Sequence, residues 1–241
     1  MRVIIGNTIM FDSFGQRYTR NNNKFDKRRK TVKLNSAKGR KASSTRWLRR
    51  QLNDPFVAEA KIRGYRSRSA FKLIQLDDKF QFLRKGHRVV DLGAAPGGWT
   101  QVLAERCING RIVALDIEKI ESISGTTIIC GDFFSSKIQH QLKTILGSKA
   151  NVVLTDMAEP ATGHRETDHF RIAALFETAV EFATDILVNG GTFVGKVFHG
   201  GAEKNILQLL KLHFTTVQHF KPLASHKESP EIYLVARGYK N

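Results

Sequence analysis

The stretch that decides the fold is RVVDLGAAPGGWT, which runs from Arg88 to Thr100. Its first five residues form an apolar run bounded by charge, which is typical of a strand buried in a parallel sheet. A glycine-rich turn follows, and a helical pattern begins at Trp99. A strand, a glycine turn and a helix in this order present open backbone N–H groups at the carboxyl edge of a sheet, where open α/β folds bind ligands.

Three kinds of ligand use such a turn. A dinucleotide site uses G-x-G-x-x-G, but Ala95 stands where the second glycine would be. A P-loop needs a lysine after its last glycine, and Trp99 follows Gly98 instead, so nothing is placed to hold a β- or γ-phosphate. The remaining pattern, D-x-G-x-x-x-G from Asp91 to Gly97, is similar to the first motif of the class I S-adenosylmethionine-dependent methyltransferases. A glycine turn without a ligand is the alternative.

Strands and helices alternate along the rest of the chain. We predict a helix from Pro55 to Arg63, capped by Asp54, and an amphipathic helix over 70–76. Further strands are predicted over 111–116, 126–130, 151–156, 190–198, 214–220 and 231–236, with helices over 170–187 and 204–212. This alternation indicates a doubly wound α/β domain.

Acidic residues follow three of these strands. Asp116 ends the strand after the glycine turn, where a Rossmann-like fold hydrogen-bonds the ribose hydroxyls of its ligand. Asp132 lies at the next strand tip, near the expected position of an adenine, although it could instead cap a helix from Ser135 onward. Asp156 ends the fourth strand. The pattern therefore predicts carboxylates along the ligand edge of the sheet.

The positive charge of the chain is concentrated at its N-terminus. Residues 1–50 hold 15 Lys and Arg and two acidic residues, a net +13 of the total +17 for 241 residues. Such a segment cannot bury enough apolar surface to fold alone, so we predict that residues 1–42 are a disordered extension before a domain over 43–241. Its expected use is contact with a polyphosphate backbone, and a solubility tail is the alternative.

Other features narrow the class of protein. No apolar run approaches the roughly 18 residues of a membrane span. Cys107 and Cys130 stand alone, so we expect reduced, buried thiols and no structural zinc. His164 and His169 are spaced as in a solvated loop rather than as metal ligands on one helix face. We expect a cytoplasmic protein without a metal, with mitochondrial targeting as the minority alternative.

Four charged residues stand in or beside apolar segments. Lys196 lies in a predicted buried strand, and Lys72 lies on the apolar side of its helix. Asp156 ends a neighbouring strand, and Glu231 begins the last one. Each alone could be a snorkelling lysine or a solvated acid. Because an unpaired buried charge is costly, the four together indicate a site at the ligand edge.

The sequence resembles the FtsJ-type RNA 2′-O-methyltransferases, in particular the RlmE group that acts on large-subunit (23S) ribosomal RNA. The resemblance covers residues 43–241 and rests on G-Y-R-S-R-S-A-F-K-L, D-L-G-A-A-P-G-G-W, G-D-F, D-M-A, G-K-V-F and K-E-S-P-E-I-Y. It implies a Rossmann-like, mostly parallel seven-stranded sheet flanked by helices. It also implies a catalytic tetrad on Lys72, Asp156, Lys196 and Glu231.

The same resemblance implies S-adenosylmethionine as the cofactor. The residues expected to bind it are Asp91, Gly93, Gly97, Trp99, Asp116, Asp132 and, at the edge, Asp156. One departure is Glu159-Pro160, which stands where the family usually has Pro-Asn. It changes a loop beside the site and none of the tetrad.

The tetrad has a physical rationale. A ribose 2′-hydroxyl is a weak nucleophile, so the protein must align it with the methyl group and help to remove one proton. A lysine accepts a proton only when it is neutral. Burial and the like charge of Lys72 favour neutral Lys196, whereas Asp156 and Glu231 act in the opposite sense and orient it. The hypothesis is Lys196 as base, Asp156 as its partner, and Lys72 with Glu231 as positioners.

We therefore predict a monomeric enzyme that methylates the 2′-oxygen of a uridine ribose in large-subunit ribosomal RNA. The resemblance implies a uridine of the A-loop in an assembled or nearly assembled subunit, with the basic extension holding ribosomal RNA outside the active site. Two alternatives stay open: a related enzyme acting on transfer RNA, and a non-catalytic ribosome-assembly factor with the same fold.

Overall fold

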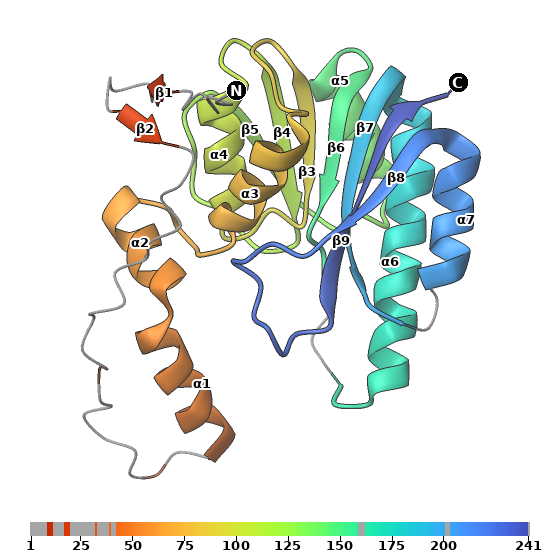
Figure 1. The fold of residues 1–241 in the computed structure, drawn as a ribbon. Coiled ribbons are helices and arrows are strands. Elements are labelled where there is room, and N and C mark those ends of the chain that lie inside the picture. The colour runs from red at the N-terminus through yellow and green to blue at the C-terminus, as the bar shows by residue number, and fades with distance from the viewer. Residues whose placement is uncertain are drawn as a thin grey trace, which may run out of the picture. The chain divides into compact units, whose positions relative to one another are not determined.

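A computed structural model describes residues 9–11, 17–19, 32, 39, 42–158, 162–200 and 203–240 of the chain (Figure 1). The chain divides into two compact units, residues 1–58 and residues 59–241. In the first unit β1 (Ile9–Phe11) pairs antiparallel with β2 (Arg17–Thr19), and α1 (Ala42–Asn53) follows. Most of residues 1–42 lie outside the described ranges, so the disorder of the extension stays a prediction.

The helix α2 (Pro55–Arg63) has the predicted bounds. The carboxylate of Asp54 accepts a hydrogen bond from the backbone N–H of Phe56 at 2.8 Å. This contact satisfies one of the helix's first N–H groups, as expected of a capping aspartate.

The second unit is built on a seven-stranded sheet with the strand order β5-β4-β3-β6-β7-β9-β8. Its strands are β3 (Arg88–Leu92), β4 (Arg111–Asp116), β5 (Thr126–Cys130), β6 (Ala150–Thr155), β7 (Leu187–Phe198), β8 (Phe214–Phe220) and β9 (Glu231–Tyr239). The first five are parallel to one another, and β9 is antiparallel to both β7 and β8. The mostly parallel α/β sheet expected from the sequence is confirmed.

Helices cover both faces of this sheet. They are α3 (Ala70–Phe80), α4 (Gly98–Arg106), α5 (Ser136–Leu146), α6 (Arg165–Ile186) and α7 (Glu203–His213). Val89 of β3 packs in a cluster with α3 and α4, whereas Val90 packs in a cluster with α5, α6 and α7. Successive strand residues point to opposite faces, so an apolar run such as β3 fills two cores at once.

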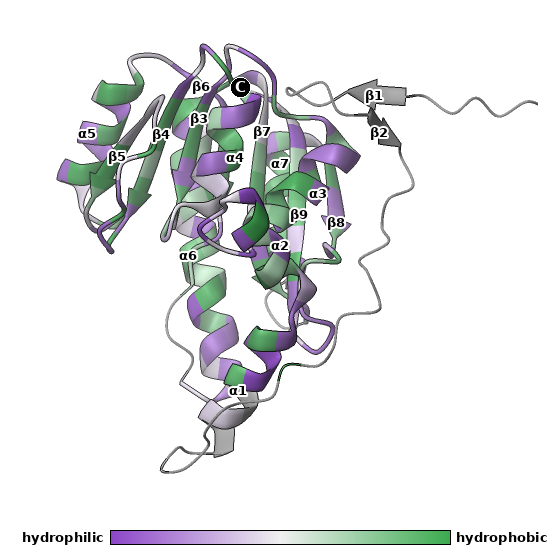
Figure 2. Ribbon diagram, turned by 90° about the vertical axis from the view of Figure 1, so that its left-hand side faces the viewer, coloured by the Kyte–Doolittle hydropathy of each residue, from purple (hydrophilic) through white to green (hydrophobic). Residues whose placement is uncertain are grey.

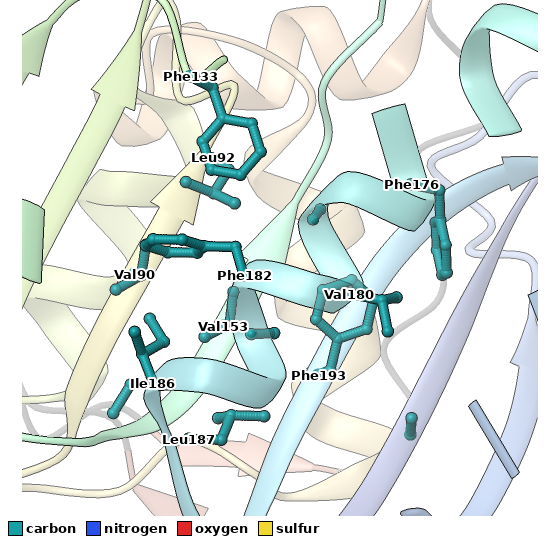
Figure 3. Packing of buried hydrophobic residues seen from close by; sticks show 14 of the residues in the cluster. Val90, Leu92, Phe133, Val153, Phe176, Val180, Phe182, Ile186, Leu187 and Phe193 are labelled. Atoms are coloured by element: carbon teal, nitrogen blue, oxygen red, sulfur yellow. The ribbon is translucent and has the colours of Figure 1, made fainter. Parts of the chain in front are cut away.

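The larger core lies between α6 and the sheet (Figure 3). Phe182 stacks edge-on against Phe133 with ring centroids 5.3 Å apart, and Phe176 packs in the same way against Phe193. In Figure 2 the middle of β4 is hydrophobic, whereas the covering helices α5 and α6 show both polar and hydrophobic residues. This amphipathic cover is what a two-sided sheet requires.

Two boundaries differ from the sequence prediction. The strand β7 begins at Leu187, three residues before the predicted start, and includes Gly190 and Gly191. Its register against β6 shifts between Ala150 and Val152, and this irregularity accommodates the glycines inside the strand. Helix α6 begins at Arg165, five residues before the predicted start.

The cysteines are both free thiols. Cys107 is buried as expected, but Cys130 is exposed because it ends the edge strand β5. Within the described residues, no helix is both long and apolar enough to span a bilayer.

Candidate active site

Two buried lysines reach the carboxyl edge of the sheet from different elements. Lys72 lies in the first turn of α3 and is 8% exposed, and Lys196 lies near the end of β7 and is 9% exposed. The residue before Lys196 has to be small, because a Cβ at Gly195 would lie 2.4 Å from Cε2 of Phe176. Close packing of β7 against α6 therefore fixes the base of the Lys196 side chain.

Each lysine forms an ion pair with one of the predicted carboxylates. The Lys196 Nζ lies 2.9 Å from Oδ1 of Asp156 and donates to the backbone oxygen of the same residue at 2.7 Å. The Lys72 Nζ lies 2.8 Å from Oε1 of Glu231. All four side chains are at most 17% exposed. The structure thus brings together the four charged residues singled out in the sequence.

Tyr233 joins the two ion pairs. Its hydroxyl donates to Oδ1 of Asp156 at 2.8 Å and accepts a hydrogen bond from Nζ of Lys72 at 3.3 Å. The register of β7 and β9 places Tyr233 opposite Lys196, and it lies two residues after Glu231, so the three side chains share one face of the sheet. Tyr233 is fully buried, which favours an inward strand aromatic over a platform for an RNA base.

The charges of this cluster are fixed by its surroundings. Burial opposes ionisation of Asp156, but the charges of Lys196 and Lys72 and the hydrogen bonds of Lys196 and Tyr233 outweigh it, and the pKa of Asp156 is lowered. Burial, followed by the charges of Asp156 and Glu231, raises the pKa of Tyr233 well above its ordinary value. The tyrosine therefore stays protonated and donates its hydrogen to an ionised Asp156.

The glycine turn lies between β3 and α4. Gly93 and Gly97 have φ values of +76° and +108°, which favour glycine. A Cβ at Gly93 would lie 2.7 Å from Cγ of Met157, and one at Gly97 would lie 2.8 Å from Nη1 of Arg66. Met157 and Arg66 therefore pack tightly against the turn. Helix α4 starts at Gly98, and its first N–H groups lie at the sheet edge.

Arg66 holds this turn in place. Its guanidinium donates to the backbone oxygens of Pro96 at 3.3 Å, Glu121 at 2.8 Å and Ser122 at 3.1 Å. These bonds connect the glycine turn to the segment that follows β4. Arg66 was not singled out from the sequence, although it lies in the G-Y-R-S-R motif.

The acidic residues predicted to bind S-adenosylmethionine lie around the turn in different environments. Asp116 accepts hydrogen bonds from the backbone N–H groups of Ala95 at 2.8 Å and Glu118 at 2.9 Å. Asp132 lies beyond the tip of β5 and accepts from the N–H of Phe134 at 2.9 Å. Helix α5 begins four residues later, at Ser136, with Ser135 at its N-cap.

Asp91 is fully buried at the end of β3. Its Oδ2 accepts a hydrogen bond from the hydroxyl of Thr100 at 2.7 Å, whereas its Oδ1 has no hydrogen-bond partner. Burial raises the pKa of Asp91, the Thr100 bond lowers it and the charges of Asp156 and Asp116 raise it, with a net value of about 7. A buried carboxylate with an unused oxygen can accept a donor group from a ligand.

Trp99 is also buried, at 3% exposed. Its indole N–H donates to the backbone oxygen of Ser69 at 2.9 Å, and its ring centroid lies 5.7 Å from that of Tyr233. In the structure Trp99 links the start of α3 to α4 and to the ion-pair cluster. Its contact with a cofactor stays a prediction.

The two histidines of the predicted loop lie in and before α6. His164 lies at the N-cap of α6, and the ring of His169 packs edge-on against Phe198 at 5.5 Å. The described part of the chain contains no group of three or more His, Cys, Asp and Glu side chains that could hold a metal ion. Glu159-Pro160 lies outside the described residues.

Comparisons with known proteins find similarity over most of the chain. The model of the FtsJ-like methyltransferase family matches residues 65–239. "Ribosomal RNA large subunit methyltransferase E" of Paramagnetospirillum magneticum is 54% identical over 216 residues, covering 87% of this chain and 88% of that protein. The protein of the same name from Acidiphilium cryptum is 55% identical over 214 residues, covering 89% and 95%.

A solved structure shares the fold as well. The crystal structure of a Plasmodium falciparum protein named as a ribosomal RNA methyltransferase superposes with a TM-score of 0.66 at 32% identity. The match covers 73% of this chain and 98% of that one.

Proposed function

Because the chain belongs to the FtsJ-like methyltransferase family, we propose that it transfers a methyl group from S-adenosylmethionine to the 2′-oxygen of a uridine ribose in large-subunit (23S) ribosomal RNA. The observation that carries this proposal is the pair of lysine–carboxylate contacts joined by Tyr233 at the carboxyl edge of the sheet. A binding module has no use for two buried lysines held beside a ligand-binding turn.

The residues around the turn fit the methyl donor. The start of α4 offers backbone N–H groups, Asp116 and Asp132 offer carboxylates for ribose and adenine, and Asp91 offers a buried oxygen without a partner. When bound, S-adenosylmethionine supplies an electrophilic methyl group. The protein's task is then to orient the ribose hydroxyl and to accept its proton.

Lys196 is suited to the role of base. A lysine amine has few orientations when two contacts hold it, and here Oδ1 and the backbone oxygen of Asp156 hold Nζ. When both N–H groups of the neutral amine are held in this way, its lone pair points in one direction. A base needs this alignment to accept a proton. Lys72 acts on the same carboxylate, because its charge contributes to lowering the pKa of Asp156.

Lys72 and Glu231 have a different proposed role. Their contact and the bond to Tyr233 leave one N–H group of Lys72 and the second oxygen of Glu231 for other partners. An ammonium can bind a phosphate oxygen, and a carboxylate can accept a hydrogen bond from a ribose hydroxyl. We assign these two residues to holding the target nucleotide.

The substrate assignment rests on the relatives and on charge. Two proteins named for methylation of large-subunit ribosomal RNA are 54% and 55% identical over most of this chain. The net charge of +17 suits a polyphosphate partner. The substrate nucleotide that we propose is a uridine of the A-loop in an assembled or nearly assembled large subunit. We propose that the enzyme acts on it as a monomer.

A methyl-transfer assay with separated substrates tests the proposal. Tritiated S-adenosylmethionine is offered with large subunits, small subunits and bulk transfer RNA in parallel, and the labelled nucleotide is identified by nuclease digestion and mass spectrometry. We expect 2′-O-methyluridine in large subunits only. Label in transfer RNA would reassign the substrate, and binding of the donor without any transfer would favour an assembly factor.

A further inference from the structure

A pocket lies at the opposite edge of the sheet from the ion-pair cluster. Its volume is about 490 Å³, and we call it the amino-edge pocket. It is lined by Phe80, Gln81, Phe82, Arg84, His87, Asn151, Val188, Asn189, Gly190, Gly191, Thr192 and Arg237. Arg237 lies near the end of β9, and six residues of strand, about 20 Å, separate it from Glu231.

The amino-edge pocket is lined by positive and neutral groups only. Its lining contains two arginines and a histidine and no aspartate or glutamate. The Arg237 guanidinium donates to the backbone oxygen of Phe80 at 3.4 Å and to Oε1 of Gln218 at 3.1 Å. Its Nε is buried without a hydrogen-bond partner, and no carboxylate of the described residues forms an ion pair with it. The guanidinium also lies over the Phe80 ring, with Cζ 5.7 Å from its centroid. Its desolvation is therefore offset by polar and cation–π contacts but not by an opposite charge.

His87 also lines the amino-edge pocket. Its Nδ1 is buried and makes no hydrogen bond of normal geometry. Burial, followed by the charge of Arg84, lowers the pKa of the ring, and a looser contact with the backbone of Phe82 acts in the opposite sense. Asp77, the carboxylate whose charge acts on His87, already forms an ion pair with Arg106. Arg84 is exposed at the mouth of the pocket, and its charge acts on His87. Two arginines thus line a space that contains no compensating negative group, with the His87 ring beside them.

The neutral groups also favour an anion. Oδ1 of Asn151 accepts the backbone N–H of Arg88 at 2.8 Å, which leaves the amide N–H₂ of Asn151 to donate. Asn189 and Gly190 are exposed at the rim, so a ligand can enter from the surface. Phe80 and Phe82 are 7% and 5% exposed, so neither ring offers a free face for stacking a base. The chemistry matches a phosphate group rather than a nucleobase.

We propose that the amino-edge pocket binds a backbone phosphate of the RNA substrate, at a point remote from the ribose that is methylated. The assignment to RNA rests on the proposed function. It is supported by the exposed Lys85 and Arg88, which flank His87 in the chain and extend the positive surface beyond the pocket. A free phosphate or mononucleotide is the other source of the same chemistry, and the test separates the two.

Charge-removing variants measure this interaction in the full-length protein. Arg84→Gln is the main variant, because Arg84 is exposed and its replacement leaves the core intact; Arg237→Gln is the second. Lys211→Gln, on the exposed side of α7, removes the same charge elsewhere and is the matched control. We expect Arg84→Gln to raise the KM for large subunits roughly fivefold with kcat unchanged. The log–log slope of binding against salt should decrease by about 0.7 to 0.9, which is the value for one phosphate that is no longer neutralised.

An NMR titration identifies the ligand. The His87 ring signals are followed while inorganic phosphate, uridine monophosphate or a short oligouridylate is added to the wild-type protein. We expect the oligouridylate to shift them at lower concentration than either small anion, and Arg84→Gln to weaken this response. Tighter binding of the mononucleotide, or unchanged KM and salt slope in both variants, would overturn the proposal. If the wild-type protein transferred no methyl group, the proposed function would fail while this titration still decided the pocket.

Discussion

Replacing Asp91 with asparagine removes a carboxylate whose ionisation opposes folding. Burial raises the pKa of Asp91 to about 7 from its ordinary 3.8. At 1.36 kcal/mol for each pH unit between the two values, the charged form destabilises the folded protein by about 4 kcal/mol. The sign follows from the raised pKa: the contribution to stability is complete below pH 3.8 and is lost as the pH rises through 7.

The pH dependence is therefore the quantity to measure. Between pH 5 and pH 8 the wild-type protein loses roughly 2.5 kcal/mol through Asp91, and Asp91→Asn does not. The amide oxygen can still accept the Thr100 hydroxyl, which bonds Oδ2 at 2.7 Å in the wild type. The amide N–H₂ takes the place of the unpartnered Oδ1, and its unsatisfied donors add a penalty of about 1–3 kcal/mol at both pH values, which cancels in the comparison.

Urea unfolding followed by tryptophan fluorescence at pH 5 and pH 8 provides the test. The free energy of unfolding of Asp91→Asn, relative to wild type, should increase by roughly 2.5 kcal/mol from pH 5 to pH 8. Glu181→Gln, at an exposed position of α6, is the control and should run parallel to wild type. Parallel curves for Asp91→Asn as well would show that Asp91 ionises in the folded state without penalty, which would refute the reasoning.

Three further variants address packing, the ion-pair cluster and the donor. Gly195→Ala places a Cβ 2.4 Å from Phe176 and should lower the free energy of unfolding by about 1–3 kcal/mol in urea titrations; an unchanged value would contradict the close packing of β7. Tyr233→Phe keeps the ring and removes the hydroxyl between Lys72 and Asp156, so kcat should fall about tenfold with donor affinity retained, whereas an unchanged kcat would make the hydroxyl dispensable. Asp132→Ala should weaken donor binding about tenfold in calorimetry with little change in stability, because the Asp132 side chain lies at a strand tip outside the core; equal affinity would remove it from the donor site.

Much of the fold could be predicted because parallel strands that are buried on both faces appear in the sequence as short, nearly continuous apolar runs. The strand β3 has the predicted bounds, since its apolar run is interrupted only by Asp91. The first residues of β7 were missed, because Leu187 continues the apolar pattern of the preceding helix and was assigned to it. Helix α5 has only a weak apolar pattern in the sequence, since Leu142 and Leu146 are its only buried side chains.

The candidate site could be predicted in part for a similar reason. Lys196 and Lys72 stood out because a charge in an apolar segment needs an explanation, and the resemblance then supplied their roles. The bridging role of Tyr233 and the role of Arg66 were not recognised, because their partners are distant in the chain. Tyr233 reaches a carboxylate 77 residues away, and Arg66 reaches a backbone oxygen 55 residues away. Only the pairing of β7 with β9 and the path of the chain after β4 bring these groups together.

The most direct test of the central claim is the single-turnover rate of methyl transfer by Lys196→Met, measured with saturating S-adenosylmethionine and large ribosomal subunits. Methionine keeps an unbranched side chain in β7 but has no group that can accept the proton. We predict a rate at least about 100-fold below wild type, with donor affinity and subunit binding unchanged. A rate equal to that of the wild type would contradict the assignment of Lys196 as the base and, with it, the account of the ion-pair cluster as the catalytic centre.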